Sequence, residues 1–397
     1  MPLSMVDDLL VMATCGQESV ALNTFMNAQV ELKKLKFHTP DNNGKTKCHK
    51  LHVGPKNHVC PKLQVHGTAM VEVDSDTFLG DIISSNGKNT KNIQKRISKG
   101  IGIIAEIMDM LERVTLGEYY FKTALLLRES KFINGILTNG EIWYGLSKSE
   151  VDELENLDTL LLRKILKTKC SVPAEYLYME LGCLNIGTIL KARRVNYLHY
   201  LVTEGQENML SKFFLTQWKY PAEDDWTLAV KEDLTDFGLQ SDLKWVKSKS
   251  EWAFKNLVRQ KAKEYAFYNF LEIREKENRS KGKEIFYTEL KPQNYLLCNE
   301  LSTIQAQTVC NNRTRMANYK ENYRGNNGHM PCILCLAHLD SQAGSFSCHV
   351  IRENVQLEGK YSDIFTDKIS TSLARTLVNI DKFREEHINT RIIKMDT

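Results

Sequence analysis

The sequence predicts an α+β fold that is mostly α. It combines a short antiparallel sheet and a helix near the N-terminus with helical regions after them and a cysteine-rich loop. Three observations carry this prediction. Short apolar runs separated by turn residues fill residues 1–87, which is typical of strands. Residues 62–172 and 222–291 contain no proline, and long proline-free stretches favour helices. Three cysteines gather near the C-terminus.

Composition places the chain among soluble globular proteins. Of its 397 residues, 42% are hydrophobic and 26% are charged, and the formal net charge is only +4. No apolar run approaches the ~18 residues that span a bilayer. Acids stand where a signal peptide needs a basic and then an apolar stretch. We therefore expect an intracellular protein, cytoplasmic or nuclear and not secreted, with no membrane partner and with reduced cysteines. The oligomeric state stays open.

The first thirteen residues predict a hairpin with acids at its tip. Asp7 and Asp8 stand between the apolar runs Leu3–Val6 and Leu9–Ala13. Charges in apolar surroundings are costly unless something pairs with them, and magnesium prefers carboxylate oxygens. Asp7 and Asp8 are therefore candidate magnesium ligands. A solvated, inert Asp-Asp turn is the alternative, because Asp is common in turns.

The remainder of residues 1–87 predicts one helix and several strands. Ser19–Phe37 has a broad apolar face and three lysines near its C-terminal end, as an amphipathic helix often does. Asn42-Asn43-Gly44 then breaks the chain. Short strands are expected at Lys47–Gly54, Leu63–Gly67 and Phe78–Ile83.

A long helix predicted from Asn89 to Val114 has two faces of opposite character. One face carries a row of lysines spaced three or four residues apart: Lys88, Lys91, Lys95 and Lys99. A nearly opposite face carries Ile93, Ile97, Ile101, Ile104 and Met108. No acid occurs from Asn86 through Ala105, although solvated faces usually mix charges. We interpret the lysine row, with Arg96 beside it, as a binding site for a nucleic-acid backbone. A merely solvated face is the alternative.

More helices are predicted at Tyr119–Leu137, Lys148–Thr168, Pro173–Gly182 and Ile186–Val202. Ser147 and Glu150 have the spacing of a capping box for the second of these. That helix has an apolar stripe at heptad-like spacing: Val151, Leu154, Leu157, Leu161 and Ile165. We interpret the stripe as core and not as a partner-binding face.

Residues 201–325 predict a further helical region. Asn208–Asp242 is rich in acids and is expected to be a surface connection with short helices. Helices are predicted at Ser250–Glu277 and Leu301–Met316. The first of them contains Tyr265, Phe267, Tyr268 and Phe270. Aromatic residues beside basic ones can stack on bases, but packing against neighbouring helices is the simpler interpretation.

The cysteine-rich segment, residues 326–350, predicts a zinc site. The candidate ligands are Cys332, Cys335, His338 and Cys348. Both thiolates of a C-x2-C pair on a turn can reach one tetrahedral ion. His338 stands three residues past Cys335 and is the preferred fourth ligand, with His349, His329 or water as alternatives. Three free thiols without a metal are the other interpretation. Residues 351–397 predict a helical tail.

Taken in order, these segments resemble the polymerase of LINE-type (jockey-like, non-LTR) retrotransposons. Ser4-Met5-Val6-Asp7-Asp8 resembles the active-site hairpin of reverse transcriptases, and the likeness continues to about Cys348. The resemblance implies five successive parts. These are a partial palm over 1–87, a helical thumb over 88–200, a helical extension over 201–325, a zinc-knuckle-like segment over 326–350 and a helical tail over 351–397.

The resemblance also implies roles for single residues. Asp7 and Asp8 would be catalytic magnesium ligands, and Lys47 would help to protonate the leaving pyrophosphate, with a solvated lysine as the alternative. Phe78, Leu79 and Gly80 would belong to a primer-grip turn that holds the primer. For Phe78 and Leu79 the alternative is plain core packing, which is compatible with that role. The family's zinc-binding histidine falls at Gly344, which has no side chain. This departure puts the zinc site in question.

The implied activity is RNA-directed DNA polymerisation, with an RNA template and a DNA primer as partners. Two-metal nucleotidyl transfer needs carboxylates that converge from separate strands, and only six residues precede Asp7. We therefore expect a fragment without fingers or upstream palm, inactive alone. The alternative is a non-catalytic nucleic-acid-binding or interaction module derived from a mobile element, and an untranslated or unfolded relic is a third interpretation.

Overall fold

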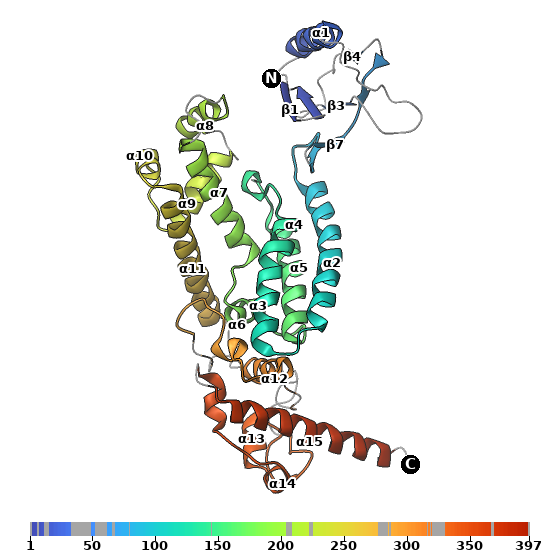
Figure 1. The fold of residues 1–397 in the computed structure, drawn as a ribbon, viewed down its shortest axis with the longest axis vertical. Helices are drawn as coiled ribbons and strands as arrows, with labels where there is room; N and C mark the ends of the chain where they lie inside the picture. Colours follow the sequence, from blue (N-terminus) through green and yellow to red (C-terminus); the bar gives the residue numbers. More distant parts are fainter. Residues whose placement is uncertain are drawn as a thin grey trace. The chain divides into compact units, whose positions relative to one another are not determined.

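The computed structural model divides the chain into two compact units. It describes residues 2–5, 8–11, 16–32, 49–51, 62–65, 68–78, 80–143, 145–203, 209–221, 225–276, 285, 287–315, 317, 319, 330–366 and 369–395. The first unit comprises residues 1–96 and 145–150, and the second comprises 97–144 and 151–397. The described residues are mostly helical, and their strands form four separate two-stranded sheets. The prediction of an α+β, mostly α fold is confirmed at this level (Figure 1).

The first unit opens with an antiparallel hairpin of β1 (Pro2–Met5) and β2 (Asp8–Val11). Leu3 pairs with Leu10, and Met5 pairs with Asp8 next to the turn. The first thirteen residues therefore contain the predicted hairpin. The elements that follow are α1 (Gly16–Leu32), β3 (His49–Lys50), β4 (Gln64–Val65), β5 (Thr68–Ala69) and β6 (Val71–Glu72). Strand β3 pairs with β6 in parallel, and β4 pairs with β5 in antiparallel.

A second hairpin, β7 (Ser75–Phe78) and β8 (Asp81–Ser84), precedes the long helix α2 (Thr90–Glu112). Burial on α2 follows one row of residues: Ile93, Arg96, Gly100, Ile104, Ile107 and Leu111. Ile101 was predicted to share the apolar face, yet it is 57% exposed. At 100° per residue it lies about 100° from the centre of the buried row. At position 100 this row has room only for glycine, because a Cβ there would lie 2.4 Å from Cδ2 of Leu157.

The next helices are α3 (Gly117–Leu127), η1 (Arg128–Ile133), α4 (Asn134–Ile136), η2 (Gly140–Ile142), α5 (Lys148–Leu166), α6 (Ala174–Leu181) and α7 (Ile186–Thr203). All lie in the second unit except the start of α5, residues 148–150, which belongs to the first. The predicted capping box is present, because Ser147 N–H donates to Glu150 Oε2 (2.9 Å) and Glu150 N–H donates to Ser147 Oγ (3.3 Å). The stripe of α5 is core, as predicted, with Leu154, Leu161 and Ile165 fully buried.

The turn between α6 and α7 is held by two distant parts of the chain. Gly182 ends α6 with φ +62°, and a Cβ there would lie 2.1 Å from the nitrogen of Pro292. Only glycine tolerates both the conformation and the close approach. Two residues after Gly182, the backbone carbonyl of Leu184 accepts a hydrogen bond (2.8 Å) from the guanidinium of Arg128. This buried guanidinium also forms an ion pair with Asp158 at 2.6 Å.

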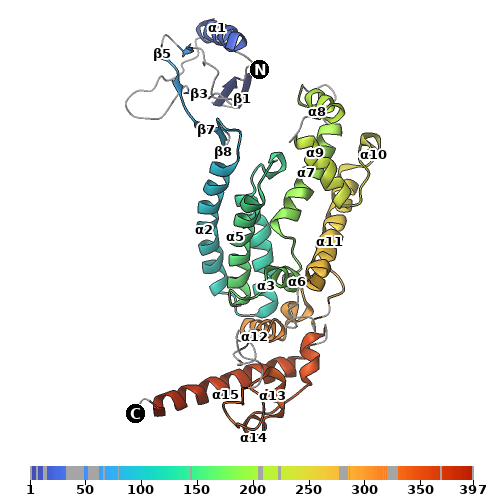
Figure 2. The same cartoon turned by 180° about the vertical axis from the view of Figure 1, so that it is seen from behind.

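Helices α8 (Met209–Lys219), α9 (Trp226–Asp236) and α10 (Leu243–Lys247) pack with α7 and α11 (Glu251–Lys276) around a shared core (Figures 1 and 2). The short helices predicted over 208–242 are present, but they pack into this core, so the prediction of a surface connection is wrong. Its acids suggested solvent, but Asp225 caps α9 and Asp233 pairs with Arg194 (2.7 Å). Apolar residues close to these acids in sequence, Val230 and Leu234, are buried.

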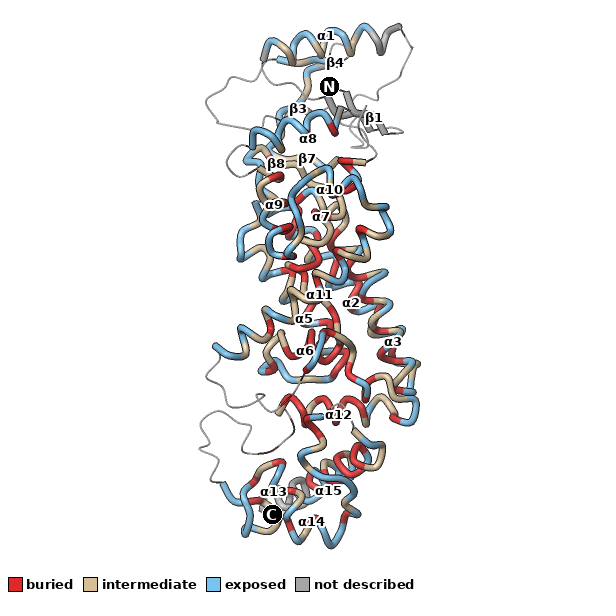
Figure 3. Tube along the Cα trace, turned by 90° about the vertical axis from the view of Figure 1, so that its left-hand side faces the viewer, coloured by how far each residue is buried: buried red, intermediate tan, exposed pale blue. Residues whose placement is uncertain are grey.

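The last part of the second unit contains η3 (Asn294–Leu297), α12 (Thr303–Arg313), α13 (Gln342–Ser347), α14 (His349–Asn354), η5 (Tyr361–Phe365) and α15 (Thr371–Met395). Helix α12 is largely buried, as the tube in Figure 3 shows, and it packs against α15. In the described part of the chain, no helix is both long and apolar enough to span a bilayer.

Candidate functional site

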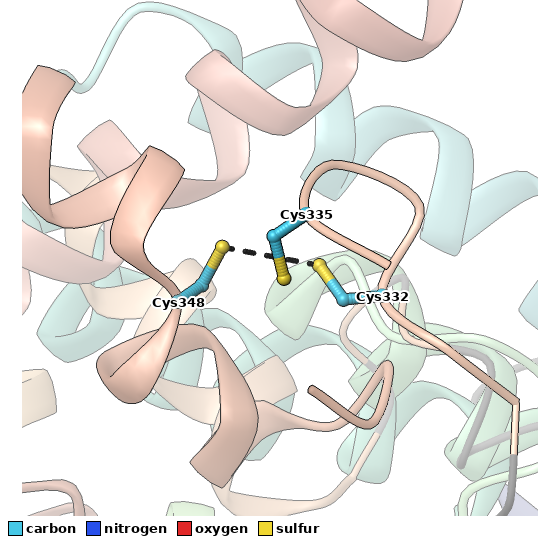
Figure 4. Close-up of side chains that lie close together, drawn as sticks. All are labelled: Cys332, Cys335 and Cys348. Carbon is cyan, nitrogen blue, oxygen red and sulfur yellow. Dashed lines mark hydrogen bonds between the residues drawn. The ribbon is translucent and has the colours of Figure 1, made fainter. Parts of the chain in front are cut away.

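Three cysteine thiols converge in the C-terminal part of the second unit. The sulfur atoms of Cys332, Cys335 and Cys348 all lie within 4.8 Å of one another (Figure 4). Those of Cys332 and Cys348 are 4.0 Å apart. Three thiolates at this spacing could hold one metal ion. The structure therefore brings together the three cysteines that the sequence predicted as ligands.

A tight turn places the first two thiols on one side of the chain. The backbone N–H of Cys332 donates to the carbonyl of His338 (2.6 Å), and the N–H of Leu336 donates to the carbonyl of Cys332 (2.8 Å). Leu336 has a positive φ of 58°, so the chain reverses directly after Cys335. Cys348 enters from the junction of α13 and α14, at the N-cap of α14.

The pKa values of two of the thiols, Cys335 and Cys348, are shifted in opposite directions by their surroundings. Burial raises the pKa of Cys348 to about 11, because a buried thiolate loses its hydration. Burial also disfavours the thiolate of Cys335, but hydrogen bonds from the backbone at His338 and Ala337 outweigh this and lower its pKa. A bound cation would favour all three thiolates, since a coordinating thiol is deprotonated.

The structure does not bring His338 to the thiols as predicted. The side chain of His338 is exposed, and the group within reach of one ion contains only the three cysteines among the residues that the structure describes. His349 is exposed as well, and His329 lies outside the described residues. At Gly344, where the resemblance places a histidine, a Cβ would lie 2.4 Å from the carbonyl oxygen of Leu339. The fold therefore closes around the position that would carry the fourth ligand.

The predicted catalytic residues are described only in part. Asp8 is the first residue of β2, whereas Asp7, Lys47 and Leu79 lie outside the described residues. Phe78 ends β7 and is half-buried, and Gly80 is exposed with φ +90° in the turn before β8. These observations leave the catalytic assignment a prediction.

The lysine row of α2 is solvent-facing, but Arg96 is not part of it. Lys88, Lys91, Lys95 and Lys99 are all exposed. Arg96 is only 4% exposed, and its guanidinium contacts Oδ1 of Asp81 at 2.5 Å. The same carboxylate accepts a hydrogen bond from Asn92 (3.0 Å). The prediction that Arg96 contacts nucleic acid is corrected, since its charge is already used to fasten β8 to α2.

Two of the lysines reach back to the β7–β8 hairpin. Lys91 Nζ donates to Ser75 Oγ (2.9 Å), and Lys95 Nζ donates to the carbonyl of Gly80 (3.0 Å). Both acceptors are neutral, and an ammonium group has three donors, so each lysine keeps its charge and two N–H groups for a further partner. The hairpin turn and the first turns of α2 therefore form one basic surface within the first unit. The sequence had indicated the two parts separately, without a signal that they join.

Comparison of the chain with protein-family models, with curated proteins and with solved structures finds no match. The function is therefore argued from the residues and their geometry.

Proposed function

We propose that this chain binds the backbone of a primer–template duplex, as the palm-to-thumb part of an RNA-directed DNA polymerase. The observation that carries the proposal is the basic surface of the first unit, where Lys91 and Lys95 flank the turn at Gly80. Exposed ammonium groups in a row attract a polyanion, and each neutralised phosphate releases a counterion. The resemblance of the β1–β2 hairpin and of the β7–β8 turn to a polymerase palm supports an RNA template and a DNA primer as the ligands.

The test is the salt dependence of binding to a fluorescent RNA–DNA primer–template. Replacing Lys91, Lys95 and Lys99 with alanine should reduce the slope of log K against log salt by about three, roughly one for each lost phosphate contact. The control variant replaces Lys164, Lys219 and Lys382, which are exposed lysines on other helices. It removes three positive charges, as the first variant does, but outside the lysine row. Equal slopes for the two triple variants would refute the proposal.

Catalysis is a separate part of the proposal. The Asp7 and Asp8 carboxylates would hold magnesium, together with at least one carboxylate from another strand, because both metal ions must be clamped. Primer extension by the full chain, abolished in Asp7→Ala, would support polymerase activity. Tight duplex binding without extension would support the second candidate, a non-catalytic nucleic-acid-binding module.

We infer that the ion suited to the three thiols is zinc. Thiolate ligands favour zinc over magnesium or calcium, which prefer oxygen. A water molecule would complete a tetrahedral site, because Gly344 offers no ligand and its surroundings leave no room for one. Such an ion would link the turn at Cys332 to the start of α14.

A further inference from the structure

Trp252 is an unusually exposed tryptophan in the first turn of α11. Its side chain is 77% exposed, whereas the four other tryptophans are buried or half-buried. An indole in water forgoes the burial that normally stabilises so large an apolar group. The position therefore suits a ring whose partner arrives from outside the chain.

Positive charge surrounds this ring. Residues 243–263, which include α10 and the first half of α11, contain seven basic residues and a single acid, Glu251. Lys255, Arg259 and Lys263 follow Trp252 at intervals of three, four and four residues and are all exposed. Residues at these intervals lie on the same side of a helix. The row from Trp252 to Lys263 extends about 16 Å along the helix axis, at 1.5 Å per residue.

Internal pairing leaves most of this charge available. Lys255 is bonded to Glu251 on the helix surface, and such exposed pairs contribute little and exchange readily with a stronger anion. Lys261 pairs with Glu264. Within the described part of the chain, neither Arg259 nor Lys263 has an ion-pair partner. The acid that caps α10, Asp242, is used by a backbone N–H of that helix.

We propose that this surface binds single-stranded nucleic acid, with Trp252 stacked on an unpaired base and Arg259 and Lys263 on the phosphates beside it. A cationic row beside an aromatic platform matches a chain of phosphates with flat, unpaired bases, since every base has a face on which an indole can stack. A duplex hides those faces, and an acidic peptide would use the charges without the ring. The surface lies wholly within the second unit and does not depend on the basic surface at Gly80.

The test compares two ligands of equal charge on the full-length chain. One is a labelled oligothymidylate of 12 nucleotides, and the other is an oligomer of the same length with abasic sugars. Trp252→Ala should weaken binding of oligothymidylate about 5- to 150-fold, the range expected for loss of one stacked base, and should leave binding of the abasic oligomer unchanged. The matched control is Tyr268→Ala, which removes another exposed ring from α11.

A double variant tests the phosphate contacts. Arg259→Gln with Lys263→Gln should reduce the salt slope for oligothymidylate by about 1.4, at roughly 0.7 for each contact to a single strand. The proposal is overturned if Trp252→Ala weakens both oligomers equally, or neither, or no more than Tyr268→Ala does. It stands or falls apart from the duplex proposal, because binding of a blunt-ended RNA–DNA duplex through α2, which offers no unpaired base, should be unchanged in Trp252→Ala.

Discussion

Replacing Arg313 with methionine removes the centre of a buried ionic network in the second unit. Arg313 is fully buried, and its Nε contacts Oε1 of Glu180 at 3.0 Å. Its guanidinium also donates to the carbonyls of Ile364 (2.7 Å) and Thr366 (3.0 Å), ahead of α15. Methionine keeps most of the apolar length of the side chain and none of these bonds.

The expected loss in the free energy of unfolding follows from the carboxylate of Glu180, which the substitution leaves without its cation. Among the residues that the structure describes, the carboxylate of Glu180, also fully buried, would retain only the hydroxyl of Tyr287 (2.6 Å) and that of Tyr295 (2.8 Å) as donors. Removing one partner of a buried pair costs about 3–5 kcal/mol, because the other charge is left uncompensated. This is a large part of the ~5–15 kcal/mol that stabilises an ordinary domain. The double variant Glu180→Gln with Arg313→Met removes both charges, so it should lose less than the two single variants together.

Urea unfolding followed by tryptophan fluorescence measures this, because all five tryptophans lie in the second unit. Arg259→Met is the matched control, since it makes the same change at an exposed site and should alter the free energy of unfolding by about 0.5 kcal/mol or less. A loss below about 1 kcal/mol in Arg313→Met, or strictly additive single losses, would refute the reasoning.

Two further predictions concern the C-terminal part of the second unit. The purified chain should carry one zinc ion that Cys348→Ala loses and Cys298→Ala keeps, as elemental analysis after gel filtration would show; equal zinc in both variants would exclude the thiol site. Burial raises the pKa of Asp381 to about 7 from 3.8, although Arg384 opposes this, so the folded chain holds a proton that the unfolded chain releases. Stability should fall as pH rises from about 4 to 7, and Asp381→Asn should resist urea better than the natural chain at pH 8, with a smaller difference at pH 5. The same advantage at both pH values would contradict this.

Much of the local structure could be predicted from the sequence. The β1–β2 hairpin, the capping box at Ser147, the short helix that ends at Gly182 and the turn at Cys332 all appear where the sequence indicated them. Each depends on residues within a few positions of one another, so the chain itself holds the information. The structure leaves the roles of the acids and of the lysine row as predictions.

Two of the errors, those at Arg96 and over residues 208–242, share one physical cause. Arg96 looked like part of a solvent-facing basic row until Asp81, fifteen residues away, proved to be its partner. The acids of residues 208–242 looked like surface residues until the fold used Asp233 to bind Arg194. A charged residue considered without its partner is predicted to face solvent, because burying an isolated charge is costly. Only the position of its partner in the fold shows that the residue is buried.

The sequence alone therefore determined where strands, helices and caps form, because these depend on side-chain period and on short-range hydrogen bonds. Tertiary structure decided which distant residues meet. It brought Cys348 to the turn at Cys332 and carried Arg313 across 133 positions to Glu180. Such pairs form only when helices far apart in the chain pack together, since packing is what excludes water and makes an ion pair or a thiol cluster worth forming.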